Sequence, residues 1–508
     1  MSFNMISVRA PFAQDFLDSS ERLSASEFDI ATEFIRIGTI CIPYLDRLIG
    51  RASSTEYKDL IVQRDETVQQ VLQYKNATRA IRRIPPEIVS QFLLLARPYM
   101  DYDDFEDPPW RLGHICRYWR DVALSTPELW AEIVIMSPER HPEEKFRTLM
   151  SRSSNAPLKV MFWSSYTTGA RTKDLLRRLV SCSHRWTSAS LVVLHADWPL
   201  LLPLRDRIPS LYFLRIGVTD WEFSGRAFFK DAGGDNGNTM NPFEIAPSLR
   251  DVTIEDLSAL KTPLTLPFKQ LTRFKVSTSH RTITSVLTLV PNLEVASLDF
   301  TDDPPASGSQ IIRLPHLRRI YVSDQTFLNQ LELPALKEIF IVGTDPAPLL
   351  SIVKRSPSIK LHTLRVAGCN PSHIARILEA CPTIEVLCMQ LMPGNKGNVL
   401  LNNLTVQSTS TDNKFTTIGP NIHTIGISVD SVSVKYELFV RMAESRWQIP
   451  DKGSPCCRLR SVELLLVKPE NELESPVTQR LDSLRDQGLR VSIVDGGRAL
   501  DAMMDWRI

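Results

Sequence analysis

The sequence predicts an α/β solenoid, in which strand and helix segments repeat along a parallel sheet, preceded by a small all-α unit and an N-terminal helical segment. Two observations predict this. A short frame (proline, any residue, leucine, two residues, then two alternating apolar residues) recurs between residues 209 and 464. Two short amphipathic segments lie within residues 84–130. We therefore expect an N-terminal helical region at 1–83, the all-α unit at 84–131, the solenoid at 132–495 and a C-terminal tail at 496–508.

Composition excludes several classes of function. The chain has 508 residues, 43% of them hydrophobic, and its 59 basic and 58 acidic residues give a net charge of +1. This balance does not indicate a nucleic-acid partner or an anionic membrane. No apolar run approaches the roughly 18 to 20 residues of a membrane helix, and the N-terminus lacks the pattern of a secretory signal. Eight cysteines without a C-x-x-C pair favour a reducing compartment, so we expect a cytoplasmic or nuclear location.

The N-terminal region is predicted to be helical in two stretches. Residues 28–48 form an apolar stretch that Gly38 and Pro43 interrupt, whereas residues 56–81 contain neither proline nor glycine. The second stretch carries an a/d-like stripe of Leu60, Thr67, Val71, Tyr74, Thr78 and Ile81. Because the stripe is short and partly polar, we favour a single helix leading into the next unit. Dimerisation through this stripe is the alternative.

Residues 84–130 predict two short amphipathic helices. Apolar residues recur at i, i+4 and i+7 in both halves: Ile88, Phe92 and Leu95, then Ile115, Trp119 and Val122. Pro85 and Pro86 suit a first helical turn, and Glu87 suits the positive end of the helix dipole. A unit of this size can hardly bury its large apolar side chains alone. The sequence therefore implies a partner surface.

These residues resemble the F-box. Ile84-Pro85-Pro86-Glu87-Ile88 is similar to the opening L-P-x-E-I of that family, and Phe92-Leu93 falls at its next apolar pair. Ile115-Cys116-Arg117-Tyr118-Trp119-Arg120 is similar to its V-C-[KR]-x-W-[RK], with Val122-Ala123 and Leu129-Trp130 completing the pattern. The acidic insert at residues 97–110, RPYMDYDDFEDPPW, is longer than a minimal F-box has. The resemblance implies a Skp-type adaptor, and through it a cullin, as partners. The residues expected to meet the adaptor are Ile84, Pro85, Pro86, Glu87, Ile88, Phe92, Leu93, Ile115, Cys116, Trp119 and Ala123.

The predicted solenoid begins with strands at 132–135, 157–163 and 189–194 and helices at 141–153 and 173–182. The recurring frame then follows as PSLYFLRI from Pro209, PSLRDVTI from Pro247, PHLRRIYV from Pro315, PALKEIFI from Pro334, PTIEVLCM from Pro382 and PNIHTIGI from Pro420, with looser copies between. The penultimate apolar residue of each copy, its anchor, is Leu214, Val252, Phe274, Leu298, Ile320, Ile339, Leu364, Leu387, Ile425 or Val462. Six of the nine intervals are 19 to 25 residues and the other three contain insertions. Most intervals therefore fall in the range of leucine-rich repeats, here irregular ones that lack the usual asparagine.

The repeats are expected to stack because none can be stable alone. Ordering about 20 residues costs roughly 20 to 40 kcal/mol, whereas burying three anchors stabilises by only about 5 to 9 kcal/mol. Neighbouring copies must therefore share one apolar layer.

The residue after each anchor points to the opposite face of the sheet, which we expect to be open and concave. That column reads Arg215, Thr253, Lys275, Asp299, Tyr321, Phe340, Arg365, Cys388, Gly426 and Glu463. Aromatic residues and arginine are enriched at binding hot spots. We therefore expect a target-binding patch of Tyr321, Phe340 and Arg365, with Arg215 and Lys275 in the same column. The alternative is that the aromatic rings only cover neighbouring repeats.

No enzymatic constellation is found. Cys369, Cys381 and Cys388 are not spaced as a zinc set, and the acidic insert lacks the glycine and final glutamate of a calcium loop. Gly233-Gly234 is not followed by the lysine of a phosphate loop, and nine dispersed histidines accompany no G-x-S-x-G motif. We expect no catalytic residue, no metal site and no cofactor.

Segments such as RTLMSRSSNAPLKV from Arg147 and RLDSLRDQGLRVSI from Arg480 also resemble fungal F-box proteins with irregular leucine-rich repeats. The resemblance implies the substrate-recognition subunit of a cullin-type (SCF) ubiquitin ligase, which holds an unidentified target protein. The alternative is a scaffold or protein-interaction module outside a ligase.

Overall fold

The structure is a computed structural model. It describes residues 11–12, 23–53, 56–80, 83–96, 111–138, 141, 143–164, 169–219, 241–255, 264–303, 311–343, 345–368, 370–391, 396–408, 415–429, 435–449, 456–467, 473 and 475–505. The chain divides into two compact units. The first contains residues 1–133 and 142–158, and the second contains residues 134–141 and 159–508.

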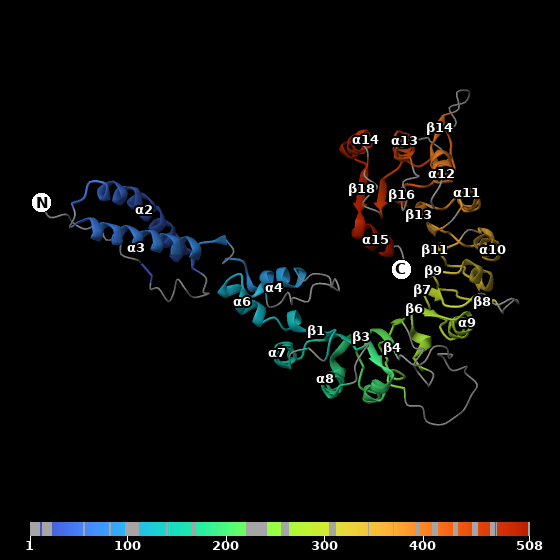
Figure 1. Ribbon diagram of the computed structural model, residues 1–508, viewed down its shortest axis with the longest axis horizontal. Coiled ribbons are helices and arrows are strands. Elements are labelled where there is room, and N and C mark those ends of the chain that lie inside the picture. Colours follow the sequence, from blue (N-terminus) through green and yellow to red (C-terminus); the bar gives the residue numbers. More distant parts are fainter. Residues whose placement is uncertain are drawn as a thin grey trace. The chain divides into compact units, whose positions relative to one another are not determined.

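The first unit begins with two long helices, α2 (Ala25–Ile49) and α3 (Glu56–Ala77), which lie side by side (Figure 1). A capping box between Ser24 and Glu27 starts α2. The helix runs without a break through Gly38 and Pro43, so the expected interruption is wrong. The reason is tertiary, because Gly38 lies against α3 and brings the two helices close together.

The central part of the stripe predicted on α3 faces α2, while Ile81 lies outside the described residues. Thr67, Val71 and Tyr74 are buried, and Tyr74 shares a core with Ala31 and Phe34 of α2. The hydroxyl of Tyr74 accepts a hydrogen bond from the backbone N–H of Phe12 at 2.8 Å. The central part of this seam is therefore covered within the chain by α2.

Shorter helices and a 3₁₀ turn follow in the first unit. They are α4 (Pro86–Leu95), α6 (Arg117–Leu124), the 3₁₀ turn η2 (Pro127–Trp130) and α7 (Glu143–Arg152).

The described residues contain a fourteen-stranded sheet whose strands follow one another in chain order (Figure 1). The strands are β1 (Glu132–Ile135), β2 (Leu158–Trp163), β3 (Trp186–Leu194), β4 (Phe213–Thr219), β5 (Asp251–Ile254), β6 (Arg273–Thr278), β7 (Val295–Phe300), β9 (Arg319–Val322), β11 (Glu338–Val342), β12 (Thr363–Ala367), β13 (Val386–Leu391), β16 (Thr424–Val429), β17 (Ser461–Leu466) and β18 (Arg490–Asp495). From β3 to β18 every neighbouring pair is parallel. The three strands predicted before the repeats are confirmed as β1, β2 and β3.

Helices connect the strands, as parallel pairing requires. They are α8 (Ala170–Ser181), α9 (His280–Leu287), α10 (Ala347–Arg355), α11 (Pro371–Ala380), α12 (Lys396–Leu404), α13 (Tyr436–Trp447) and α14 (Ser475–Asp486), with 3₁₀ turns η3 (Ser183–Arg185), η4 (His195–Leu204), η5 (Phe268–Gln270) and η6 (Gln325–Gln330). Figure 1 shows α9 to α14 along the outer side of the curved sheet. Two small sheets pair β8 (Ile312–Arg313) with β10 (Leu331–Glu332), and β14 (Gln407–Ser408) with β15 (Phe415–Thr416).

The register confirms nine of the ten predicted anchors. These nine stand opposite one another across the sheet. Together with Ala296 they form the row Leu214, Val252, Phe274, Ala296, Ile320, Ile339, Leu364, Leu387, Ile425 and Val462. The exception is β7, where Ala296 takes the place expected for Leu298. A short alanine side chain does not stand out as an anchor in the sequence, although Ala296 is fully buried. The fold is therefore a mixed α/β chain with a long parallel sheet, which is compatible with the predicted solenoid.

An insertion between β13 and β16 is tied to α13 by one buried arginine. The guanidinium of Arg446 donates to the carbonyl oxygens of Leu404, Gly419 and Ile418 at 2.7, 3.3 and 2.7 Å, and to the hydroxyl of Thr417 at 2.8 Å. Burial lowers the pKa of Arg446 to about 10, so the side chain stays charged at neutral pH. These bonds explain how a polar insertion can be held without interrupting the sheet.

Candidate protein-binding sites

The helical unit around α4 and α6 has a small core of its own. Val89 and Leu93 of α4 are buried, as are Val122, Ala123, Leu129 and Trp130. Two side-chain hydrogen bonds fix the arrangement: the Tyr118 hydroxyl donates to the Ile84 carbonyl at 2.7 Å, and the Trp130 indole donates to the Ala123 carbonyl at 2.7 Å. The Arg152 guanidinium lies 4.3 Å from the Trp130 ring centroid, which connects this unit to α7.

Another side of α4 presents apolar side chains to solvent. Ile88 is 46% exposed, Phe92 50% and Leu95 80%. We call these three residues the α4 face. Their spacing places them on one side of the helix, and the buried side is formed instead by Val89 and Leu93. Ile115, just before α6, is also 51% exposed. An apolar surface of this kind is typical of a protein-binding site.

The other residues expected at the adaptor contact fall into two groups. Pro85, Pro86 and Glu87 are exposed, and Ile84, Cys116 and Trp119 are partly buried. Leu93 and Ala123 are buried, with 0% and 1% of their surface exposed. The expectation that they touch a partner is therefore corrected: both side chains belong to the core of the helical unit. The insert at residues 97–110 lies outside the described residues.

The inner face of the sheet carries the column expected to bind a target. Strand pairing aligns Arg215, Thr253, Lys275, Ser297, Tyr321, Phe340, Arg365, Cys388, Gly426 and Glu463. Ser297 replaces the expected Asp299 because the anchor of β7 is Ala296. Lys275 is exposed. Arg215 is partly buried, donates from Nε to Glu255 at 2.8 Å and lies 6.0 Å from the Trp163 ring centroid.

The expected open patch is corrected by the structure. Tyr321 and Phe340 are only 2% and 3% exposed, and their ring centroids are 5.1 Å apart in an edge-to-face arrangement. They belong to one buried cluster with Cys388, Leu465 and Ala499. Ala499 lies in α15 (Gly496–Asp505), a helix formed within the segment expected to be a tail. These two positions of the inner face are therefore buried, in a cluster that also includes a residue of α15.

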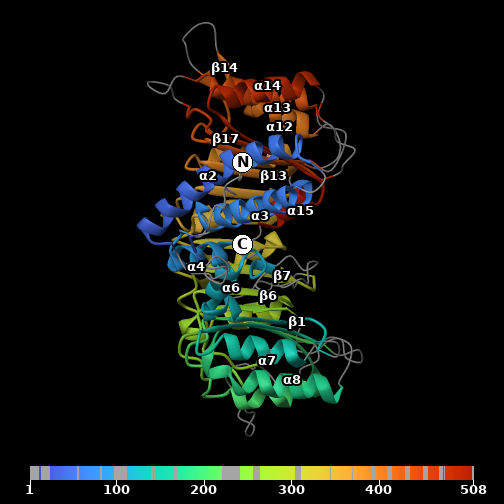
Figure 2. The same cartoon turned by 90° about the vertical axis from the view of Figure 1, so that its left-hand side faces the viewer.

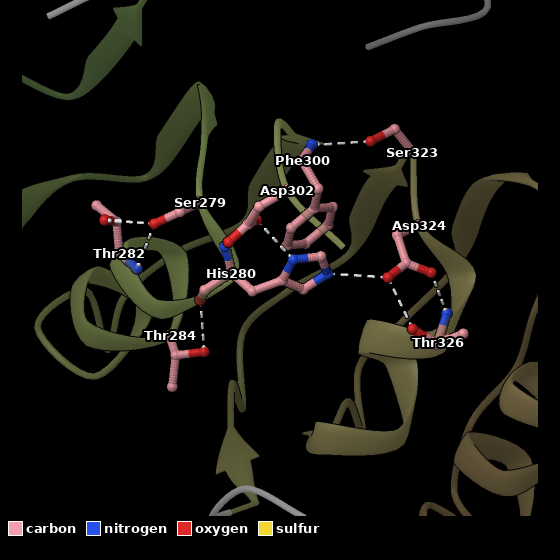
Figure 3. Close-up of polar contacts among 9 residues, drawn as sticks. All are labelled: Ser279, His280, Thr282, Thr284, Phe300, Asp302, Ser323, Asp324 and Thr326. Atoms are coloured by element: carbon pink, nitrogen blue, oxygen red, sulfur yellow. Dashed lines mark hydrogen bonds and ion pairs between the residues drawn. The ribbon is translucent and has the colours of Figure 1, made fainter. Parts of the chain in front are cut away.

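A polar cluster missed by the sequence analysis surrounds His280 (Figure 3). Nδ1 of the buried ring lies 2.8 Å from an Asp302 oxygen, and Nε2 lies 2.8 Å from an Asp324 oxygen. The ring stacks on Phe300 with centroids 4.0 Å apart. These residues come from the start of α9, the end of β7 and the turn after β9, so the cluster joins three successive strand segments.

The His280 cluster ties neighbouring segments of the sheet unit together. Each ring nitrogen has a carboxylate oxygen from a different segment at hydrogen-bond distance. The neighbouring Ser279 hydroxyl lies 2.9 Å from the Thr282 hydroxyl. In sequence the histidine could not be recognised, because Asp302 and Asp324 follow 22 and 44 residues later.

Comparison of the sequence with models of protein families and with curated proteins finds no match. Function therefore rests on the geometry of the sites.

Burial raises the pKa of both the Cys381 and the Cys388 thiol to about 11, so neither is a reactive thiolate at neutral pH. Within the described ranges, no group of three or more His, Cys, Asp or Glu residues is arranged to hold a metal ion. The helices described here are also too short or too polar to span a bilayer.

Proposed function

We propose that this chain is the substrate-recognition subunit of a cullin-type ubiquitin ligase. Residues 84–131 act as an F-box that docks on a Skp-type adaptor, and the sheet unit, interpreted as irregular leucine-rich repeats, holds a target protein. Ubiquitin transfer is left to other subunits. The receptor contributes proximity, since tethering raises the effective concentration of the target near the ligase.

The α4 face is the observation that carries the proposal. Its three apolar side chains are exposed on a ten-residue helix, and fully burying one such side chain stabilises an interface by about 1.5 to 3 kcal/mol. The residues beneath, Val89 and Leu93, are fully buried and hold the helix in place. A face that is ordered before binding loses little conformational entropy in docking.

Co-purification with a Skp-type adaptor tests the docking step. We expect the wild-type chain to retain the adaptor and the Ile88→Asp/Phe92→Asp variant to lose it, with affinity falling at least about tenfold, because each aspartate places a charge in an apolar contact. Ile245→Asp/Val399→Asp is a matched control. Its two residues are 41% and 52% exposed, close to the 46% and 50% of Ile88 and Phe92, but lie in the sheet unit. Failure of the wild-type chain to bind the adaptor would disprove the receptor role.

A second measurement separates a receptor from a scaffold. Proteins that co-purify with the chain are followed by their half-life in cells that express either the wild type or Ile88→Asp/Phe92→Asp. A true target becomes longer-lived with the variant, because it is still held but no longer delivered. Unchanged half-lives, with adaptor binding intact in the wild type, would favour the scaffold.

A further inference from the structure

The helix α2 has an apolar surface that its contact with α3 does not cover. The two helices lie side by side (Figures 1 and 2), and Ala31, Phe34 and Gly38 of α2 are buried where they meet. Four large apolar side chains on another side of α2 remain 37% to 60% exposed. They are Ile30, Ile37, Ile40 and Tyr44, and we call them the α2 stripe.

The spacing of the α2 stripe is that of a contact between paired helices. Ile30, Ile37 and Tyr44 follow one another at intervals of seven residues, and Ile40 comes three residues after Ile37. Apolar residues repeated in this way occupy the a and d positions at which two helices of a coiled coil meet. The stripe extends from residue 30 to residue 44, which is roughly 21 Å along the helix axis. It is therefore long enough for several layers of side chains to pack against a second helix.

The charges beside the α2 stripe are distributed unevenly along the helix. Asp29 is exposed next to the stripe near the N-terminal end, and Arg47 is exposed near the C-terminal end. Residues 29 and 47 are 18 positions apart, which is five full turns at about 3.6 residues a turn, so both lie on the same side of α2. Among the described residues neither takes part in an ion pair, whereas Glu33 between them pairs with Arg36 at 2.6 Å. One end of this side is therefore negative and the other positive.

A second copy of α2 in antiparallel orientation complements both the stripe and the charges. When the two helices are centred on Ile37, this residue meets its own counterpart and Ile30 faces the partner's Tyr44. Asp29 then lies at nearly the same level as the partner's Arg47, at both ends of the pair. A parallel pair would instead bring the two Asp29 side chains to the same level, roughly 27 Å along the axis from Arg47. Charge complementarity therefore selects the antiparallel pair.

We propose that two copies of this chain associate through their α2 stripes, packed antiparallel about Ile37. The stripe is separate from the α4 face, so this inference does not depend on the proposed function. In the proposed function such a pair presents two α4 faces, and thus two sites for the adaptor. Four side chains a copy make a smaller contact than the roughly 20 to 30 residues a side of a standard interface. We therefore expect reversible association at micromolar concentrations.

Sedimentation velocity of the full-length chain tests the association. Between about 1 and 100 µM the wild type is expected to shift from one chain to two. Ile37→Glu brings two carboxylates together at the centre of the pair and should raise the dissociation constant at least about tenfold. Leu72→Glu is the matched control, because Leu72 is 49% exposed but lies on α3, outside the α2 stripe. It should associate like the wild type.

A charge reversal tests the antiparallel orientation. Asp29→Lys alone, or Arg47→Glu alone, places like charges together at both ends of the pair. Each should weaken association about threefold to tenfold. The variant with both changes restores opposite charges and should associate like the wild type. Because both side chains are exposed, circular dichroism should show the same helix content in all these variants.

The outcomes are distinct. A wild-type chain that remains single at about 100 µM overturns the proposal, as does a Leu72→Glu variant that dissociates as readily as Ile37→Glu. A charge-reversed double variant that associates no better than the single variants overturns the antiparallel pairing. Adaptor binding is measured on the same samples. A chain that binds the adaptor but never associates disproves the α2 contact alone, whereas one that associates without binding the adaptor disproves the proposed function alone.

Discussion

Asp197 is a buried carboxyl group in η4 with 1% of its surface exposed. Neither carboxylate oxygen accepts a hydrogen bond from the described residues, and the Lys173 ammonium lies 3.8 Å from one of them. Burial raises the pKa of Asp197, and the positive charges of Lys173 and Arg177 oppose the rise only in part. The ionised form is therefore disfavoured in the folded chain.

Asp197→Asn is expected to stabilise the protein at neutral pH. Because the folded pKa lies above the unfolded value of 3.8, stability from this group is present below that value and is lost as pH rises through the folded pKa. The asparagine amide does not ionise. The free energy of unfolding should therefore rise by on the order of 1 kcal/mol at pH 7, and this gain should disappear as the pH falls toward the unfolded pKa. Urea unfolding of the variant and the wild type at pH 7 and near the unfolded pKa measures this gain in stability.

Asp174→Asn is the control for this change. Asp174 lies in neighbouring α8, is 55% exposed and pairs with Arg178 at 2.8 Å. Its amide variant should change stability by less than about 0.5 kcal/mol. Equal stability of Asp197→Asn and wild type at pH 7 would show that Asp197 is not penalised by burial.

At the scale of elements, the contact of α2 with α3 depends on one glycine. A Cβ at Gly38 would lie 2.4 Å from Cγ2 of Val71. Valine is β-branched and stiff, so it cannot turn aside easily. The close approach therefore requires that position 38 has no side chain, although glycine is a poor helix former.

Gly38→Ala is expected to destabilise the helix pair by about 1 to 3 kcal/mol, because overpacking outweighs the gain in helix propensity. Val71→Ala in the same chain should recover much of the loss, since it removes the clashing methyl groups. Thermal unfolding of the single and double variants, followed by circular dichroism, measures the coupling. Gly50→Ala is the control, because a Cβ there meets only ordinary contacts at 3.7 Å. Additive effects of Gly38→Ala and Val71→Ala would contradict this contact.

At the scale of the whole molecule, the sheet unit is built from contacts between successive strands. Leu364 of β12 stands between Ile339 of β11 and Leu387 of β13, and all three are fully buried. In such a row each segment depends mainly on its neighbours. Local damage should therefore decay along the sheet.

Leu364→Ala is expected to lower stability by about 2 to 5 kcal/mol. Backbone amides should lose the most protection against hydrogen exchange in β11, β12 and β13. They should lose the least in β3 and β4, which lie far along the sheet. Lys275→Ala, at an exposed position of β6, is the control and should change little. An equal loss of protection from β3 to β18 would show instead that the sheet unfolds as one unit.

The sequence alone determined the positions of the strands from β1 to β17 in the long sheet, nine of the ten anchors and the apolar spacing of α4. These features are local: each copy of the frame carries its own proline, leucine and alternating apolar residues, and Ile88, Phe92 and Leu95 share a helix side by spacing alone. The same spacing could not say that Leu93 is buried, because that depends on which side α6 covers.

Only the tertiary structure decided how the faces of these elements are used. Tyr321 and Phe340 have the alternation of open residues, yet both are buried in a cluster that also contains Ala499 of α15. α2 continues through Pro43 because packing on α3 offsets a weak local preference. The physical reason is the same in each case: burial depends on contacts between residues far apart in the chain, and a local pattern does not contain them.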